Sequence, residues 1–324
     1  MTEDDGLICA YLLDGRGGGR AIGWSEIASW RPQDGLLWLH LDRAGPDARR
    51  WLLEGSGLDP VIAGALLAEE VRPRELRIED ALLVVLRGVN LNPGADPEDM
   101  VGIRIWLEPT RIVTVRHRRL MAVTDLREAL AIGRGPSGPG QFLVMLSAAL
   151  IARVGPVIDD LVDEVDRLED TVVTAHSADL RGALGSLRRQ AIALRRYLAP
   201  QREVMARLTM EQTSWLEGDD KAYLREISDR TIRFVEDLDA ARERAGVVQD
   251  ELSSLISDQM NRTMYLLTVV AAVLLPPSLL TGLLGINVGG MPGVDNPMSF
   301  AIVVVLIIAL AVVEVAVLRR LKWI

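Results

Sequence analysis

The apolar positions divide the chain into three parts. Between residues 6 and 140, short β-prone runs alternate with helical stretches, which predicts a mixed α/β domain over residues 1–140. The predicted strands are 7–13, 36–41, 81–86, 101–107 and 111–115, and the predicted helices include 47–53 and 60–67. After Gly140 the pattern is almost entirely helical.

Residues 141–217 predict a helical hairpin with opposite charges on its two arms. Seven acids lie between 159 and 170, seven arginines lie between 178 and 213, and a short break at 175–177 separates the arms. An antiparallel hairpin would place the two charge sets face to face, as paired surfaces. The alternative is that the acids attract cations; those in question are Asp159, Asp160, Asp163 and Glu164, together with Asp295 further along the chain.

Residues 218–263 predict a stalk helix. Apolar or small residues recur every seven positions, at 224, 231, 238, 245 and 252 and again at 227, 234, 241, 248 and 255. Five such heptads describe a supercoiling helix that needs partners. We expect it to pack both on the hairpin and on other subunits, and to continue without a break into the next segment as one helix of about 67 residues.

Two segments are long and apolar enough to cross a membrane. Residues 264–285 carry no charge, and residues 300–318 carry only Glu314, which snorkelling or pairing with Arg262 would explain. The loop 286–299 has no Lys or Arg, whereas basic residues precede the first span and follow the second, in the tail 319–324. We therefore expect a multi-pass protein of the bacterial inner membrane with cytoplasmic N- and C-termini.

Charge and residue types restrict the chemistry. The net charge is −9, and residues 1–260 account for −11, so nucleic acid is not an expected partner. His40, His117, His176 and Cys9 all lie outside the spans, which disfavours a dehydrated zinc site there. No phosphate-binding loop or nucleophile–base spacing is present, so we expect neither an enzyme nor a cofactor.

A pore would need a ring of subunits, because two helices have no interior. Within the first span a stripe of small, polar and flexible residues recurs at steps of three or four, which places it on one helix face. The stripe contains Asn261, Met264, Thr268, Ala271, Leu275, Ser278 and Gly282. Small residues also mark ordinary helix contacts, so both interpretations stay open.

Several motifs are similar to those of a known family. Asn-Arg-Thr-Met at 261–264, Pro276, Thr-Gly-Leu-Leu at 281–284 and Gly285-Ile286-Asn287 resemble the CorA superfamily of divalent-cation transporters. Ile286 and the following Val-Gly-Gly-Met-Pro-Gly resemble its zinc-transporting ZntB branch, whereas its magnesium channels carry Gly-Met-Asn. Val-Arg-Pro-Arg at 71–74 and the run 86–94 are similar too, and Pro277 departs from the usual single proline.

The resemblance implies a funnel-shaped homopentamer whose first span lines the pore. Asn261, Met264, Leu275, Ser278 and Asn287 would then face the pore, with a hydrated cation near Asn287. The implied cargo is Zn²⁺, with Mg²⁺, Co²⁺, Ni²⁺ and Cd²⁺ as alternatives. A two-span receptor and a membrane-anchored enzyme are the competing classes, and the short loop and the missing catalytic motifs count against them.

Overall fold

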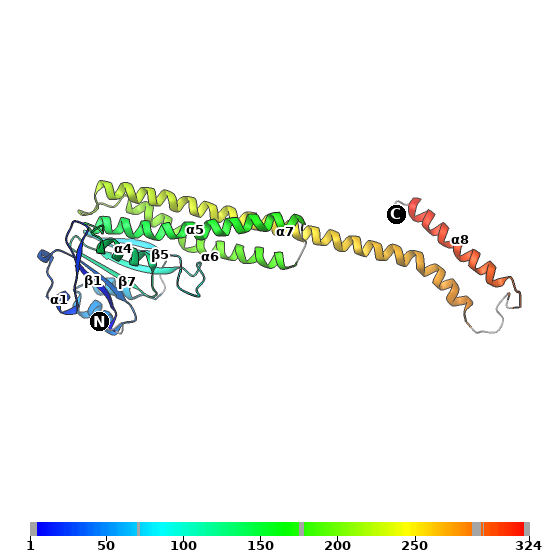
Figure 1. Ribbon diagram of the computed structural model, residues 1–324, viewed down its shortest axis with the longest axis horizontal. Coiled ribbons are helices and arrows are strands. Elements are labelled where there is room, and N and C mark those ends of the chain that lie inside the picture. The colour runs from blue at the N-terminus through cyan, green and yellow to red at the C-terminus, as the bar shows by residue number, and fades with distance from the viewer. Residues whose placement is uncertain (1–4, 70–71, 175–177, 287–292, 294, 321–324) are drawn as a thin grey trace. The chain divides into compact units, whose positions relative to one another are not determined.

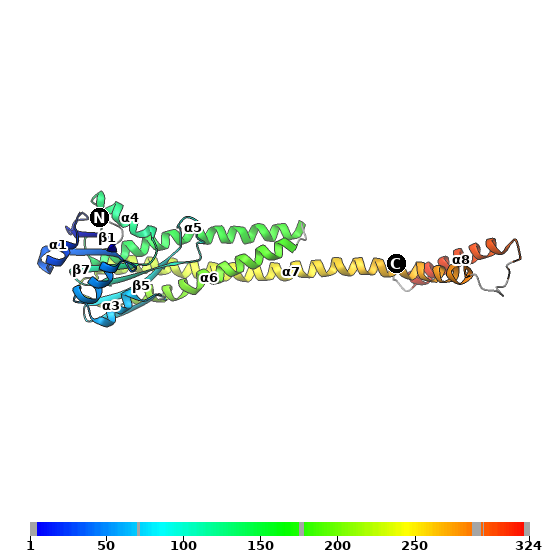
Figure 2. The ribbon, with the colours of Figure 1, turned by 90° about the horizontal axis from the view of Figure 1, so that it is seen from below.

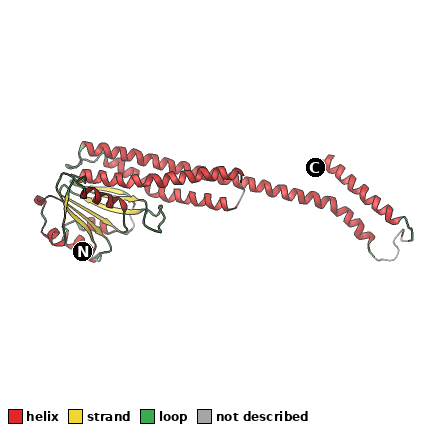
Figure 3. Ribbon diagram, viewed as in Figure 1, coloured by secondary structure: helices red, strands yellow, loops and turns green. Residues whose placement is uncertain are grey.

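The computed structural model describes residues 5–69, 72–174, 178–286, 293 and 295–320. The chain forms two compact units, the first extending to Gln249 and the second beginning at Asp250. All of the strands that the structure describes belong to the N-terminal part of the first unit (Figure 3).

A seven-stranded mixed sheet forms the centre of the first unit. Its strands are β1 (Leu7–Leu13), β2 (Gly19–Ala21), β3 (Leu36–Asp42), β4 (Arg74–Ile78), β5 (Ala81–Gly88), β6 (Val101–Leu107) and β7 (Arg111–Arg116). Their order in the sheet is β2-β1-β3-β7-β6-β5-β4, and every neighbouring pair is antiparallel except β3 and β7. The inner strands are buried on both faces, which explains their continuous apolar runs.

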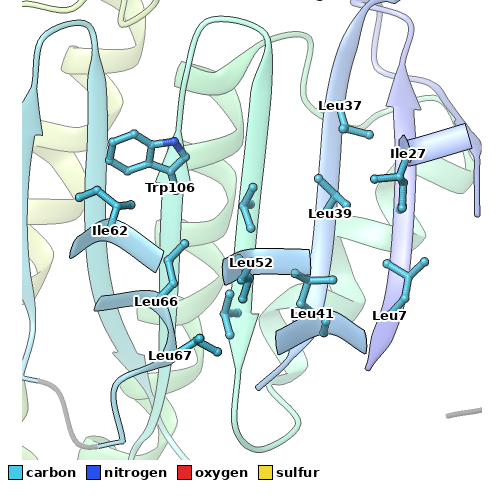
Figure 4. Packing of buried hydrophobic residues seen from close by; sticks show 14 of the residues in the cluster. Leu7, Ile27, Leu37, Leu39, Leu41, Leu52, Ile62, Leu66, Leu67 and Trp106 are labelled. Carbon is cyan, nitrogen blue, oxygen red and sulfur yellow. The ribbon is translucent and has the colours of Figure 1, made fainter. Parts of the chain in front are cut away.

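Short helices cover one face of the sheet. They are α1 (Trp24–Ser29), α2 (Pro46–Arg50), the π turn η3 (Trp51–Gly55) and α3 (Pro60–Leu67), and a 3-10 turn, η2 (Pro32–Asp34), precedes β3. Leu37, Leu39 and Leu41 of β3 form one buried cluster with Leu52 and Leu66 of this layer (Figure 4). Alternate residues of the same strand point to the opposite face.

The opposite face carries α4 (Met121–Ala131) and the first part of α5 (Pro139–Thr174). Trp38 of β3 meets Phe142 of α5 edge to face, with 5.0 Å between ring centroids. Both side chains are fully buried. The sheet is therefore the middle of three layers.

Most predicted elements are confirmed, and four were missed. β1, β6 and α3 have the predicted bounds, and β3, β5 and β7 extend one or two residues further. The sequence interpretation missed α1, β2, α4 and β4. Strands β2 and β4 form the two edges of the sheet, where exposed polar residues interrupt the apolar signal.

Helices α5, α6 (Ala178–Leu208) and the first part of α7 (Gly218–Leu284) lie side by side in the first unit (Figures 1 and 2). As predicted, residues 218–284 form one unbroken helix. Its heptad positions Leu224, Thr231, Leu238, Ala245 and Leu252 are all at most 1% exposed. These heptad positions are thus buried inside the chain, which confirms the expected packing on the hairpin, and packing on other subunits stays a prediction.

The expected pairing of charges between α5 and α6 is also wrong for the described residues. No ion pair that the structure describes joins these two helices; both pair with α7 instead. Arg244 of α7 bonds Asp166 and Glu169 of α5 at 2.6 and 2.8 Å, and Arg195 of α6 bonds Asp239 of α7 at 2.6 Å. Helix α7 carries charges of both signs and forms ion pairs with each arm separately.

The second unit contains the last part of α7 and α8 (Ser299–Arg320). Three described helices, α5, α7 and α8, are long and apolar enough to cross a membrane. The most apolar window of α5 is 56% buried in the structure, whereas the windows of α7 and α8 are 0% buried. Burial in the first unit therefore accounts for the apolar character of α5.

Candidate ion pathway

The predicted stripe lies on the last part of α7, and all of its members are exposed. Met264 is 59% exposed and Leu275 is 66% exposed. Leu266 and Leu279, on other faces of this segment, are each 63% exposed. The stripe is therefore distinguished by its chemistry, because the other faces carry large aliphatic side chains suited to lipid.

Hydroxyl groups on and beside the stripe bond the helix's own backbone. Thr268 Oγ1 donates to the carbonyl of Met264 at 2.8 Å, and Thr281 Oγ1 donates to the carbonyl of Ser278 at 3.0 Å. Each hydroxyl thus uses its proton inside the helix and keeps lone pairs for other partners. Such oxygens can accept hydrogen bonds from the water shell of a passing cation.

Two prolines interrupt the hydrogen-bond ladder in the middle of this segment. Pro276 and Pro277 have no N–H, so the carbonyls of Ala272 and Val273 lose their usual helical donors. In a membrane such carbonyls need another partner, and a water-lined path would provide one. The double proline that the sequence singled out therefore adds backbone oxygens to the segment.

The helix ends beside the Gly-Ile-Asn motif. Helix α7 stops at Leu284, and the Gly285 N–H donates to the carbonyl of Thr281 at 2.9 Å. Ile286 is 47% exposed. Asn287 lies outside the described residues, so its place at a pore mouth stays a prediction.

The acids of α5 form no metal site. Asp159, Asp160 and Asp163 are exposed and take part in none of the ion pairs among the described residues. Glu164 pairs with Arg167 on the same helix, and this contact holds the pKa of the Glu164 carboxyl below its usual value. The described residues contain no group of three or more His, Cys, Asp or Glu that could hold a metal.

Asp295 lies in the turn that precedes α8. It is exposed, and the turn around it is closed by the Asn296 N–H bonding the carbonyl of Gly293 at 3.2 Å. Ser299 Oγ donates to the same carbonyl at 2.6 Å. Asp295 is therefore placed as a surface charge beside the second apolar helix.

The two histidines that the structure describes, His40 and His117, lie outside the apolar helices. His40 is 1% exposed within the sheet, where its Nδ1 lies 2.9 Å from Thr114 Oγ1. Burial lowers the pKa of His40 to about 3, so this side chain is neutral. His117 is exposed after β7, and His176 lies outside the described residues.

Glu314 is a carboxyl within the second apolar helix. Its Oε2 is buried and has no hydrogen-bond partner among the described residues. The described ion pairs do not include the contact with Arg262 that the sequence suggested. Within the described part of the chain, this carboxyl group is therefore unpaired.

One feature of α7 was missed by the sequence interpretation. In the first unit a line of exposed positions follows the same alternating spacing of three and four residues as the stripe: Ala222, Glu226, Asp229, Arg233, Glu236, Ala240 and Glu243. Four of these seven residues are acids, and Arg233 lies 3.9 Å from Glu226. In the sequence these positions form a third heptad phase, which the apolar positions alone do not reveal.

Comparisons with known proteins agree with these features. The profile of the family described as CorA-like Mg²⁺ transporter protein matches residues 33–320. The chain belongs to this family, whose members are membrane transporters of divalent cations and not enzymes.

Relatives and solved structures match nearly the whole chain. The divalent cation transporter CmaX of Pseudomonas aeruginosa is 44% identical over 329 residues, which cover 99% of this chain and 98% of the relative. The zinc transport protein ZntB of Yersinia pseudotuberculosis is 38% identical over 316 residues, covering 98% and 95%.

The solved structures show the same fold. The full-length CmaX structure, at 43% identity, superposes with a TM-score of 0.87 and covers 99% of both chains. The complete CorA magnesium transporter of Methanocaldococcus jannaschii superposes with a TM-score of 0.81 at 20% identity, covering 98% of this chain and 99% of that one.

Proposed function

We propose that this protein carries Zn²⁺ across the bacterial inner membrane through a ring of five copies. The observation that carries the proposal is the polar stripe on the exposed last part of α7. The zinc assignment is supported by the Gly-Ile-Asn motif and by relatives named as zinc transport proteins at up to 38% identity.

Two helices per chain cross the membrane in this proposal. Helix α5 is excluded because its apolar window is 56% buried, which leaves the apolar parts of α7 and α8. The loop between these helices has no Lys or Arg, while Arg319 and Arg320 end α8. Both termini therefore face the cytoplasm.

The first of these spans, residues 264–285, lines the pore. Two helices cannot surround water, so several copies of α7 must present their stripes to a common axis. Neutral oxygens from Asn261, Thr268, Ser278 and Asn287 would then meet the ion. Such dipoles attract a hydrated cation but bind it less tightly than a ring of carboxylates would, so the ion can be released.

Acids before the span raise the local concentration of cations. On α7 itself, Glu226, Asp229, Glu236 and Glu243 follow the heptad phase of the pore stripe. On α5, the exposed Asp159, Asp160 and Asp163 have no described ion-pair partner. Their negative charges are therefore not offset by an arginine and can attract cations. Asp295 supplies a further negative charge beside the second span.

Uptake into proteoliposomes tests the cargo. The purified protein should move Zn²⁺ faster than Mg²⁺ or Co²⁺ at equal low concentration, with and without a pH gradient. Faster flux of Mg²⁺ or Co²⁺ would identify the protein as a magnesium or cobalt transporter of the same family and would contradict the zinc assignment.

Mass measurement tests the ring separately. Under mild detergent conditions the mass should equal five chains of 35.5 kDa plus bound detergent. A monomer or dimer that still transports in liposomes at the same protein density would contradict the pentamer.

A further inference from the structure

Three residues with donor or acceptor atoms form a row across the sheet of the first unit. Cys9 of β1 is in register with His40 of β3, and His40 is in register with Thr114 of β7. Residues directly opposite one another on neighbouring strands have their side chains on the same face of the sheet. All three are at most 6% exposed. The row takes no part in the proposed ion pathway.

The next pair along β1 and β3 identifies the face on which the row lies. Tyr11 and Trp38 are in register, and their rings stack with 5.7 Å between centroids. Because side chains alternate between the faces of a strand, Cys9 shares the face of Tyr11, and His40 shares the face of Trp38. Trp38 packs against Phe142 of α5. Cys9 and His40 are therefore neighbours under the helical layer of α4 and α5.

The hydrogen bonds of Thr114 determine the tautomer of His40. Thr114 Oγ1 donates its proton to the carbonyl of Leu39 at 2.9 Å and accepts a bond from Trp38 Nε1 at 3.0 Å. A hydroxyl has only one proton, so the contact of Oγ1 with His40 Nδ1 at 2.9 Å requires the proton to be on Nδ1. In this neutral ring, His40 Nε2 therefore carries a lone pair.

The lone pair of His40 is buried and unused. His40 Nε2 has no hydrogen-bond partner among the described residues. The two nitrogens of an imidazole ring point away from each other, and Nδ1 is directed at Thr114 of β7. Strand β3 lies between β7 and β1, so Nε2 is directed toward the side of Cys9. A buried acceptor without a partner is costly, and a ligand bound to Nε2 would remove that cost.

The charges near this pair restrict the ion that fits. Burial is the main influence on the pKa of Cys9 and of His40, and the positive charges of Arg116 and Arg127 lower both values. The described residues offer no third His, Cys, Asp or Glu ligand. Zn²⁺ takes four ligands, and on one thiolate it would leave a net positive charge beside the two arginines. A monovalent cation bound by one thiolate and one neutral imidazole forms an uncharged complex, which burial tolerates.

The thiol of Cys9 is a ligand that becomes available by losing its proton. Burial raises the pKa of Cys9 to about 12, so the free thiol is protonated at neutral pH and is a poor nucleophile. A soft cation displaces this proton: the S–H bond breaks, a bond between sulfur and the metal forms, and the proton leaves to solvent. His40 binds through a lone pair that it already has. One proton is therefore released for each ion bound.

Strand β1 is open beside Cys9. Strand β2 pairs only with residues 11–13 of β1, and the Ile22 N–H bonds the carbonyl of Ala10 at 3.0 Å. This pairing stops one residue before Cys9. A register shift between Leu7 and Cys9 interrupts the ladder with β3. Such irregularities occur at sheet edges and beside functional sites, where they re-aim a side chain. The open part of β1 gives an ion a route to the thiol.

We propose that Cys9 Sγ and His40 Nε2 form a two-coordinate site for a soft monovalent cation, of which Cu(I) is the cellular example. Thiolate sulfur selects soft metals, and imidazole nitrogen suits copper. Ligands that approach from two neighbouring strands match the linear coordination of Cu(I). A bound ion links β1 to β3. The site is separate from the stripe of α7, so it does not depend on the proposed transport of Zn²⁺.

Calorimetric titration of the full-length chain with Ag(I), a stable stand-in for Cu(I), tests the site. Silver nitrate is titrated into protein in detergent without chloride or added thiols, first alone and then with Zn²⁺ in large excess. We expect one tight site per chain that Zn²⁺ does not occupy. Titrations in two buffers of different ionisation enthalpy should show one proton released per ion. Absence of a saturable site, or its blockage by Zn²⁺, overturns the proposal.

Variants identify the two ligands. Cys9→Ala removes the thiolate and should raise the Ag(I) Kd at least about a hundredfold. His40→Asn keeps an amide N–H for Thr114 but removes Nε2, and it should raise the Kd at least about tenfold. Met210→Leu removes a sulfur that is 81% exposed elsewhere, and it should leave the Kd unchanged. Thermal unfolding without metal verifies that each variant is folded. Natural affinity in folded Cys9→Ala or folded His40→Asn protein overturns the site.

X-ray absorption at the copper edge tests the ligands without any substitution. The natural protein is loaded with one Cu(I) per chain under anaerobic conditions. The spectrum should show two-coordinate copper with one sulfur and one nitrogen neighbour. Coordination by sulfur alone would exclude His40 as a ligand, and coordination by three or more ligands would exclude the two-coordinate geometry. Either result overturns the proposal, even if the variant of His40 does not fold.

Discussion

The two parts of α7 follow the same period of about seven residues but carry different residues at their exposed positions. In the first unit its apolar heptad positions are buried against the chain's own helices, and acids predominate on the exposed line. In the second unit the described apolar side chains of α7 are largely exposed. The comparison shows that one period occurs in two settings, one where the chain buries the apolar side chains and one where it leaves them exposed.

The largest expected effect is on stability, and it separates the two parts directly. Leu238 of α7 is fully buried, so Leu238→Ala should lower the free energy of unfolding by about 2–5 kcal/mol. Leu266→Ala, at a residue 63% exposed in the second unit, is the matched change and should cost far less. Thermal unfolding of both purified variants measures the difference. Equal losses of stability would contradict the distinction between a buried and an exposed part of α7.

The next effect concerns transport. Asn287→Ala should reduce Zn²⁺ flux at least about tenfold, if the amide ring contributes on the order of 1.4 kcal/mol. Asn287→Asp should instead tighten cation binding and slow release. Pentamer content is measured beside flux. Natural flux from a correctly assembled Asn287→Ala protein would refute the role of Asn287 at the pore mouth.

A smaller effect is expected from the acids of α5. Replacing Asp159, Asp160 and Asp163 with Asn and Glu164 with Gln should lower uptake at limiting Zn²⁺ by about threefold or more, because the local cation concentration falls. Assembly should not change. The control neutralises Glu54, Asp96, Glu98 and Glu128, none of which belongs to α5, α6 or α7. The same loss in the control would assign the effect to net charge alone.

The smallest effect concerns the loop that leads into α7. Ser214 donates to Asp80 through its N–H at 2.7 Å and its hydroxyl at 2.5 Å, and these bonds hold the pKa of the Asp80 carboxyl below its usual value. Asp80→Ala should therefore lower the free energy of unfolding by no more than about 1 kcal/mol at neutral pH.

The pH dependence gives the sign of this contribution. The folded-state pKa is lowered, so the stabilisation is present above the ordinary Asp value of about 4 and is lost as the pH falls through the folded value. Unfolding temperatures of the natural protein and of Asp80→Ala should therefore converge in acid. A difference that grows below pH 4 would contradict the assignment.

The sequence by itself determined the elements whose signals are local. Continuous apolar runs gave β1 and β6 with their observed bounds, and the absence of a breaker gave the single helix from Gly218 to Leu284. The motif around Gly285 led to the family that the comparisons show. These features need only neighbours along the chain, so periodicity and propensity decide them.

Only the tertiary structure decided which helices and strands pack against one another. Helix α5 has a window apolar enough to cross a membrane, and its burial in the first unit is a long-range fact that composition does not contain. The acids of α5 and the arginines of α6 looked complementary, yet α7 pairs with both because it packs beside each. One cavity is likewise lined by Arg43, which follows β3, and by Arg87 of β5 and Arg104 of β6, which only the strand order brings together.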